Sequence, residues 1–242
     1  MGGEVYEKSF NLSPASFKEV IALLVRVWDA PTRLFHWALA ACFVGLIVTS
    51  QIGGGAMVWH FQFGYGVLSL LLFRMVWGLL GGHWSRFSTF LVGPREVWRY
   101  LRGKGLQHHD VGHNPLGALS VVAMLVFLAL QVTTGLMSDD EIANAGPLTR
   151  FVSSAWVSNA TYYHKAIGKL VLLGLVTLHV SAIVYYFFGK QENLIQPMIT
   201  GDKTLDFAAP SARDSGSERR LAAVIFLVCM GLVSGTVIGL VG

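Results

Sequence analysis

The chain has 242 residues, of which 53% are hydrophobic and only 13% are charged, and its mean hydropathy is +0.55. A soluble domain carries about 25% charged residues, so this composition argues against a soluble protein and indicates an integral membrane protein. The formal net charge of +4 is modest, and nucleic acid is not an expected partner. The two cysteines, Cys42 and Cys229, form no CxxCH motif, which excludes covalent c-type haem by this pattern.

Five apolar segments approach or exceed the roughly 20 residues that a helix needs to cross a bilayer. The alternating pattern of a membrane β-barrel is absent, so we expect an all-α integral membrane protein. Glu4 and Glu7 precede any apolar run, and no secretory signal is recognisable. The whole chain is therefore expected in the mature protein. The predicted spans are roughly 34–52, 58–80, 116–137, 164–188 and 221–241.

Lysine and arginine are distributed unevenly between the two sides of these spans. Fourteen of them fall before the first span, between the second and third, and between the fourth and fifth, whereas three lie on the other side. Because basic connections stay in the cytoplasm, we expect a cytoplasmic N-terminus and a C-terminus on the exterior side.

Two connections have a distinctive composition. Residues 94–102, PREVWRYLR, mix aromatic residues with arginines, which fits either a short helix lying on the inner leaflet or a basic loop that only enforces topology. Residues 201–220 are polar and include Gly, Pro and Ser, and they are predicted to be a flexible linker. The expected organisation is a cytoplasmic segment 1–25, a membrane domain 26–200, the linker 201–220 and an additional helix 221–242.

Eight histidines fall into two groups. Four of them belong to the basic connection between the second and third spans and are expected to be solvated: His83, His108, His109 and His113. The other four stand at span positions: His36, His60, His164 and His179.

The depth of each span histidine predicts how they pair. His164 and His179 are fifteen residues apart, which is about 22 Å along a helix and leaves both on broadly one face. With the N-terminus inside, His36 and His179 lie near the cytoplasmic side, and His60 and His164 lie near the outer side. Two histidines from different helices at one depth can ligate a haem iron from both sides. The alternatives are histidines hydrogen-bonded between helices, or a haem-free proton transporter.

Several neighbouring residues support the haem hypothesis. Gly64 and Gly168 each follow a histidine by four residues, so they lie beside it on the helix and could give clearance for a haem plate, or they serve ordinary close helix packing. Arg74 is expected at the depth of His36 and His179, where it would pair with a haem propionate or extend to the headgroups. Arg33 and Lys165 are weaker candidates for the same role.

Three stretches carry a family resemblance: RVWDAPTRLFHW at 26–37, the HxxxG at 60–64 followed by Arg74 in FRMVWG, and YYHKAIGKLVLLGLVTLH at 162–179. Together they resemble the prokaryotic cytochrome b561 family, which includes b-type cytochrome subunits of nickel hydrogenases and formate dehydrogenases.

The resemblance covers about residues 26–200 and implies a four-helix transmembrane bundle that holds two haem b groups. The family's ligands carry over to His36 with His179 and to His60 with His164, and its arginine carries over to Arg74. The resemblance also implies electron exchange with membrane quinone, so a bound quinone is a further candidate ligand. A prokaryotic family further implies a bacterial inner membrane, so the exterior C-terminus would be periplasmic. The fifth span and its linker depart from the four-span pattern.

Two functions remain open at this point. The first is a dihaem cytochrome that passes electrons across the bilayer between the quinone pool and a periplasmic redox partner. The second is a membrane anchor and electron-relay subunit without its own substrate site, which recruits a periplasmic dehydrogenase or cytochrome c. In the second case the acidic loop 138–161 and the fifth span would be the docking surfaces.

Overall fold

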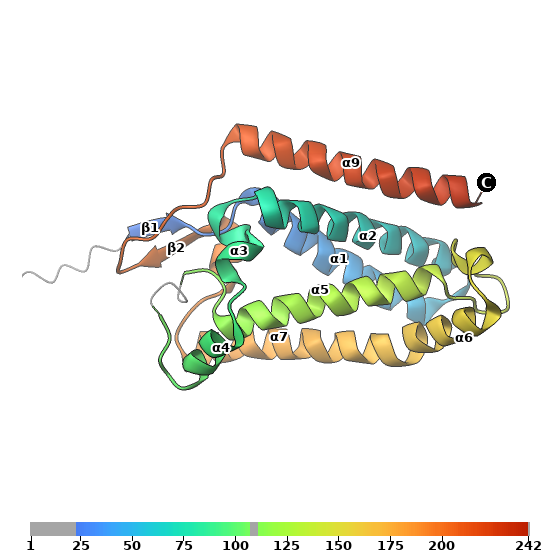
Figure 1. Cartoon of the computed structure of the whole chain (residues 1–242), viewed down its shortest axis with the longest axis horizontal. Helices are drawn as coiled ribbons and strands as arrows, with labels where there is room; N and C mark the ends of the chain where they lie inside the picture. Colours follow the sequence, from blue (N-terminus) through green and yellow to red (C-terminus); the bar gives the residue numbers. More distant parts are fainter. Residues whose placement is uncertain (1–22, 107–110, 242) are drawn as a thin grey trace, which may run out of the picture.

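The computed structural model describes residues 23–106 and 111–241 and is predominantly helical (Figure 1). Two short strands pair with each other and every other named element is a helix. The elements in chain order are β1 (Leu23–Arg26), α1 (Ala30–Ile52), α2 (Met57–Leu80), α3 (Phe87–Phe90), α4 (Pro94–Leu101), α5 (Pro115–Leu136), α6 (Ser154–Tyr162), the π-helix η6 (Tyr163–Gly168), α7 (Lys169–Gly189), α8 (Ile195–Thr200), β2 (Asp202–Leu205) and α9 (Gly216–Val241), with short 3-10 helices at Gly54–Ala56, His83–Ser85 and Thr149–Phe151.

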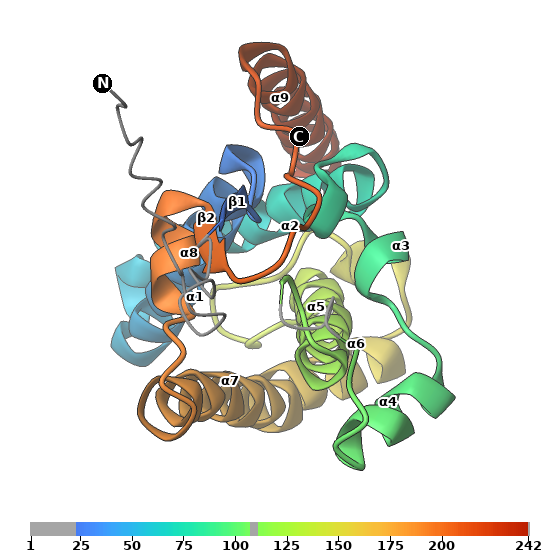
Figure 2. The same ribbon diagram turned by 90° about the vertical axis from the view of Figure 1, so that its left-hand side faces the viewer.

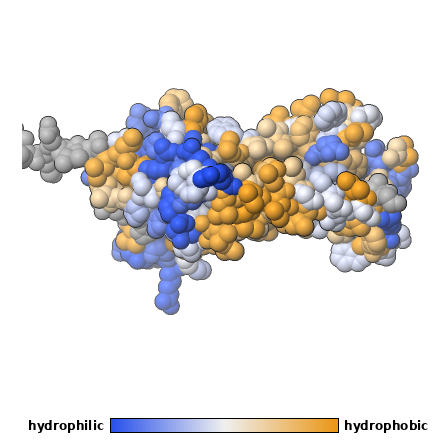
Figure 3. Space-filling model, turned by 90° about the horizontal axis from the view of Figure 1, so that it is seen from above, coloured by the Kyte–Doolittle hydropathy of each residue, from blue (hydrophilic) through white to orange (hydrophobic). Residues whose placement is uncertain are grey.

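Five helical segments are long and apolar enough to cross a membrane, as the sequence predicts. The fourth is longer than expected, because α6, η6 and α7 run on continuously over Ser154–Gly189. Large apolar side chains on these helices face outward; Leu119, Leu178 and Val228 are each more than half exposed. On the face that Figure 3 shows, apolar residues gather across the middle of the molecule and many polar residues lie toward its ends. Such a band fits contact with lipid.

The second helix occupies the centre of the bundle and packs on both sides. On one side, Phe73 and Trp77 of α2 form an apolar cluster with Phe35 of α1 and Cys229 of α9. On the other side, Val67 and Leu71 pack with α5 and α7. The fifth span therefore rests on α2 and α1, away from α5 and α7 (Figure 2).

A buried carboxylate joins the helices at the end where the basic connections lie, which we call the basic end. Asp29 is fully buried and caps α1 by accepting a hydrogen bond from the Thr32 amide at 2.8 Å. It also accepts hydrogen bonds from Trp77 Nε1, the Gly82 amide and Ser85 Oγ at 3.1, 3.0 and 2.7 Å. A buried charge is tolerated when it is fully hydrogen-bonded, so Asp29 fixes the end of α2 against the start of α1.

The segment predicted to be a flexible linker is instead ordered. β2 pairs antiparallel with β1, with Leu23 opposite Leu205, and the Ala212 amide donates to the Arg26 carbonyl at 2.7 Å. The sequence predicted an all-α protein, whereas residues 23–26 form the strand β1 that pairs with β2. The prediction failed because the partners of this segment lie more than 170 residues away in the sequence.

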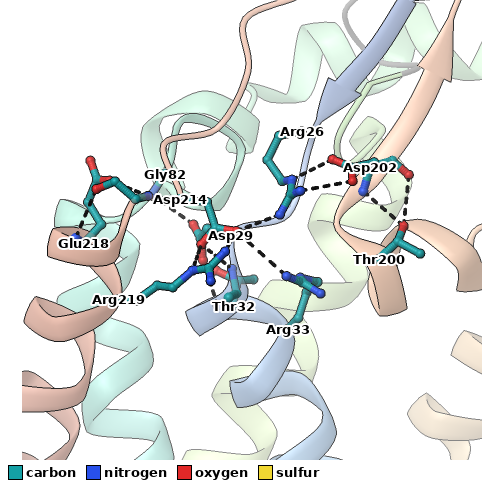
Figure 4. Close-up of polar contacts among 12 residues, drawn as sticks. Arg26, Asp29, Thr32, Arg33, Gly82, Thr200, Asp202, Asp214, Glu218 and Arg219 are labelled. Carbon is teal, nitrogen blue, oxygen red and sulfur yellow. Dashed lines mark hydrogen bonds and ion pairs between the residues drawn. The ribbon is translucent and has the colours of Figure 1, made fainter.

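An ionic network holds this segment at the start of α9 (Figure 4). Arg26 contacts Asp202 at 2.6 Å and Asp214 at 2.8 Å, and Arg219 contacts Asp214 at 2.9 Å. Burial alone would raise the pKa of Asp214, but hydrogen bonds from Arg219 and the Ala30 amide and the charges of Arg219 and Arg26 together lower it. Asp214 thus links the segment before α9 to β1 and to the start of α1.

Candidate functional site

The four span histidines lie in two pairs, one toward each end of the bundle. The rings of His36 on α1 and His179 on α7 have centroids 6.4 Å apart; we call them the basic-end pair. The rings of His60 on α2 and His164 on η6 have centroids 6.2 Å apart; we call them the far-end pair. These are the pairs that helix depth predicts.

The ring separations fit an ion held between the rings. An imidazole nitrogen binds a metal at about 2 Å, so two rings on opposite sides of one ion have centroids roughly 6 Å apart. A direct hydrogen bond between the rings would bring the centroids to about 5 Å. The observed separations of 6.4 and 6.2 Å match the first distance and exceed the second.

Each ring of the far-end pair is held by a neighbouring helix. His60 Nδ1 donates to the Leu46 carbonyl of α1 at 3.1 Å, and His164 Nδ1 donates to the Gln131 carbonyl of α5 at 2.9 Å. A carbonyl oxygen can only accept, so in each neutral ring Nδ1 carries the hydrogen and Nε2 keeps its lone pair. Metal-binding histidines are normally oriented in this way.

The π-helix η6 completes the contact around His164. Its residues include His164, and the Gln131 side-chain Nε2 donates to the His164 carbonyl at 2.9 Å while the Gln131 carbonyl accepts from the ring. Gln131 thus holds both the main chain and the ring of one residue. Single π-turns are frequent at functional sites, and the sequence argument, which assumed a regular α-helix, did not anticipate this one.

A cavity of about 490 Å³ lies at the far-end pair. Such a volume lies in the usual range for a cofactor site. Gly64 and Lys165 line it along with both histidines. A Cβ built on Gly64 would meet nothing within 4 Å, so this glycine borders open space.

Gly168 has a different environment from Gly64. A Cβ built there would collide with the Gln131 side chain and with Tyr163, and Gly168 does not line the cavity. The sequence hypothesis of haem clearance is therefore corrected at this position. Gly168 allows η6 to pack closely on α5, which is the ordinary role of small residues in membrane helices.

Arg74 lies near the basic-end pair and is 3% exposed. Its guanidinium donates to the Ser85 carbonyl at 2.9 Å and lies 4.7 Å from the centre of the Phe87 ring. These contacts show that the side chain is directed into the protein and does not extend to the headgroups. Within the described residues, the His36 Nδ1 atom is buried without a hydrogen-bond partner, so this ring lacks the helix contact that both far-end rings have.

His113 is a residue whose position the sequence argument missed. Expected to be solvated, it instead packs between the rings of Trp28 at 4.7 Å and Phe90 at 4.8 Å, and its Nδ1 is buried. Burial, followed by the charges of Arg74, His179 and His36, lowers the pKa of His113 to about 3. The available signal was the sequence HNP at 113–115, because Asn114 caps α5 and Pro115 begins it, which places His113 directly at a span end.

The two weaker propionate candidates, Arg33 and Lys165, lie in different surroundings. Arg33 donates to the Ile199 carbonyl at 2.5 Å and lies 3.9 Å from the Asp214 carboxylate, so its charge is directed toward the C-terminal segment. Lys165 lies at the far-end cavity. His83 is partly exposed, whereas His108 and His109 lie outside the described residues.

The fold and the paired histidines define a multi-pass membrane protein of the cytochrome class. The family model of prokaryotic cytochrome b561 matches residues 27–201, and the chain belongs to that family. It is accordingly a b-type cytochrome, a membrane protein of electron transport whose cofactor is haem b. Paired imidazoles at metal-binding separation fit that cofactor.

Curated relatives carry one recurrent name. The chain is 24% identical to a probable Ni/Fe-hydrogenase B-type cytochrome subunit of Bradyrhizobium diazoefficiens, with 74% of this chain and 85% of the relative covered. It is 26% identical to the protein of the same name from Azotobacter vinelandii, over 81% of this chain and 95% of the relative. A Rhodobacter capsulatus relative of that name is 25% identical, over 83% and 91%.

Proposed function

We propose that this protein is a dihaem b-type cytochrome that passes electrons across the bilayer between the quinone pool and a periplasmic redox partner. The observation that carries the proposal is the presence of two histidine pairs, each bridging two helices at a separation suited to one iron. The assigned iron ligands are His36 with His179 and His60 with His164. Four spans would supply the haem-binding bundle, and α9 would be an addition to it.

The chain's residues would hold the cofactor and limit its chemistry. When bound, haem b supplies a one-electron carrier. Two histidine ligands leave no open iron position, which favours electron transfer over oxygen chemistry. The carbonyls of Leu46 and Gln131 fix the tautomer and angle of the far-end rings, so little rearrangement should accompany binding.

The charged residues near each pair suit the haem propionates. Arg74 would serve the basic-end site, because a desolvated guanidinium is a strong partner for a carboxylate. Lys165 would serve the far-end site from the cavity wall. Arg33 is less suited to this role, since it already contacts Ile199 and lies near Asp214.

The distribution of basic residues supports an orientation. By the positive-inside rule, the basic end faces the cytoplasm, the C-terminus faces the periplasm, and the far-end pair lies on the periplasmic side. A spacing of fifteen residues from His164 to His179 would separate the two irons by about 22 Å along the membrane normal. The haems would then act as two stepping stones between the two surfaces.

A second candidate is an anchor and electron-relay subunit that has no substrate site of its own. The relatives named as Ni/Fe-hydrogenase subunits favour it, and a periplasmic hydrogenase-like dehydrogenase would be the partner. The acidic loop 138–161 and α9 would offer docking surfaces, and a cytochrome c is the other partner class that such a subunit would recruit.

Spectroscopy and quinol reduction test these proposals in turn. A dithionite-induced b-type α-band is expected in the purified chain, and its absence would refute haem binding altogether. If quinol reduces the haem of the isolated chain, the first function is supported. Reduction that requires a copurifying soluble partner would instead support the relay subunit.

A further inference from the structure

Helix α4 is short and strongly two-sided. It runs over Pro94–Leu101, and Figure 2 shows it at the periphery of the bundle. Trp98 and Leu101 are each 56% exposed, and Leu91, just before the helix, is 51% exposed. The protein leaves about half of each of these apolar residues uncovered, so an apolar medium or partner should meet them.

Arginines follow the same helix at a helical spacing. Arg95, Arg99 and Arg102 are separated by four and three residues, which places them along one stripe. Trp98 lies beside this stripe, and the Arg102 guanidinium lies 4.7 Å from its ring centre. Arg99 is paired with Glu96 at 3.1 Å. Across the parts of the chain with described structure, no carboxylate lies within ion-pair distance of Arg95 or Arg102. Both exposed guanidinium groups can therefore bind an external anion.

Contacts with two spans fix the depth of α4. The Tyr100 hydroxyl lies 3.2 Å from the hydroxyl of Tyr186, near the end of α7, and Asn114, the N-cap of α5, donates to that same hydroxyl at 2.6 Å. Because α5 begins and α7 ends at the basic end, α4 lies at the boundary between hydrocarbon and water. At that level a tryptophan and a leucine can enter the acyl region while the arginines remain among headgroups.

We propose that α4 forms a binding site for an anionic phospholipid in the leaflet at the basic end, with Arg95 and Arg102 contacting the phosphate and Trp98 and Leu101 contacting the acyl chains. Guanidinium groups bind phosphate in a bidentate manner, and basic clusters beside spanning helices are typical anionic-lipid sites. A lipid is favoured over a protein partner because a single molecule satisfies the unpaired cations and the apolar face together. This proposal does not depend on the haem assignment.

Competition between spin-labelled lipids tests the site. The full chain, loaded with haem, is placed in phosphatidylcholine nanodiscs, and its preference for spin-labelled phosphatidylglycerol over spin-labelled phosphatidylcholine is measured. Each basic residue near the surface contributes about fivefold to such a preference, so the double variant Arg95→Gln/Arg102→Gln should lower it by roughly 25-fold. Trp98→Ala should weaken association of both labelled lipids.

A matched control distinguishes a lipid site on α4 from a general attraction of anionic lipid to the positive charge of the basic end. Arg213 and Arg220 are also exposed at the basic end but belong to the C-terminal segment and α9, so Arg213→Gln/Arg220→Gln removes the same charge from another surface. Retention of the wild-type preference in this control, with an unchanged haem spectrum in all variants, would support the proposal. Equal losses in both double variants, or no loss in the α4 variant, would overturn it.

Discussion

The two histidine pairs share a ring separation but differ in what surrounds them. In the far-end pair, both rings donate to carbonyls of neighbouring helices and border a cavity of about 490 Å³, and the ring planes are nearly perpendicular at 86°. In the basic-end pair the planes meet at 55°, and His36 Nδ1 has no partner among the described residues. A buried arginine and a third histidine stand nearby instead.

With a haem in each pair, as proposed above, this difference predicts unequal haem potentials. A hydrogen bond to Nδ1 makes the imidazole a more basic ligand, which stabilises oxidised iron and lowers the potential of the far-end haem. The Arg74 cation favours the less positive, reduced iron and raises the potential of the basic-end haem. Both effects act in the same direction, so electrons should move energetically downhill from the far end to the basic end.

Removal of one ligand gives the largest expected effect. His60→Ala should lose about half of the haem, and redox titration should show that the lower-potential step has disappeared while the higher one remains. His179→Ala should lose the higher-potential step. If either variant loses both haems equally while the protein remains folded by circular dichroism, the pairing is wrong.

Filling the cavity should remove the far-end haem without touching a ligand. Gly64→Leu places a side chain in the open space beside His60, and most of the far-end haem should be lost. Gly174→Leu is the matched control, because Gly174 also has open space around its Cβ position but does not line the cavity. Haem content by pyridine haemochrome distinguishes the two, and equal haem in both variants would contradict the role of Gly64.

The charge of Arg74 should set part of the difference in potential. Arg74→Gln is expected to lower the basic-end potential by roughly 60 mV, a tenfold change in the redox equilibrium, with the far-end step unchanged. Arg74→Lys keeps the charge and should recover most of the potential even if the contact with Ser85 is weakened. A shift of the far-end step instead would indicate that Arg74 serves the other site.

The smallest effect concerns His113 and pH. Its pKa is about 3 in the folded protein and 6.5 in the unfolded chain, so folding holds the ring neutral. Because the unfolded chain binds this proton more readily, the free energy of unfolding is unaffected above pH 6.5 and decreases as the pH falls toward 3. The decrease is about 2 kcal/mol by pH 5. Thermal unfolding of the haem-loaded protein should show this slope, and His113→Phe, which keeps an aromatic ring there, should flatten it. An unchanged slope would contradict the burial of His113.

The sequence by itself determined the membrane class, the five spans and the pairing of the histidines. Span length and hydrophobicity are local properties, and helix rise converts residue number into depth, so His36 could be matched with His179 without tertiary information. The same logic placed Arg74 at the right end. The clearance prediction from the HxxxG pattern failed for Gly168, because this pattern does not reveal which neighbouring helix faces the glycine.

Tertiary structure decided the features that depend on distant partners. The ordered segment 201–215 relies on Arg26, and the tautomers of His60 and His164 rely on carbonyls of other helices. The burial of His113 depends on Trp28 and Phe90, which come from separate parts of the chain. Hydrophobic pattern specifies which residues enter the membrane, but hydrogen bonding between helices specifies how each ring is oriented, and that follows only from packing.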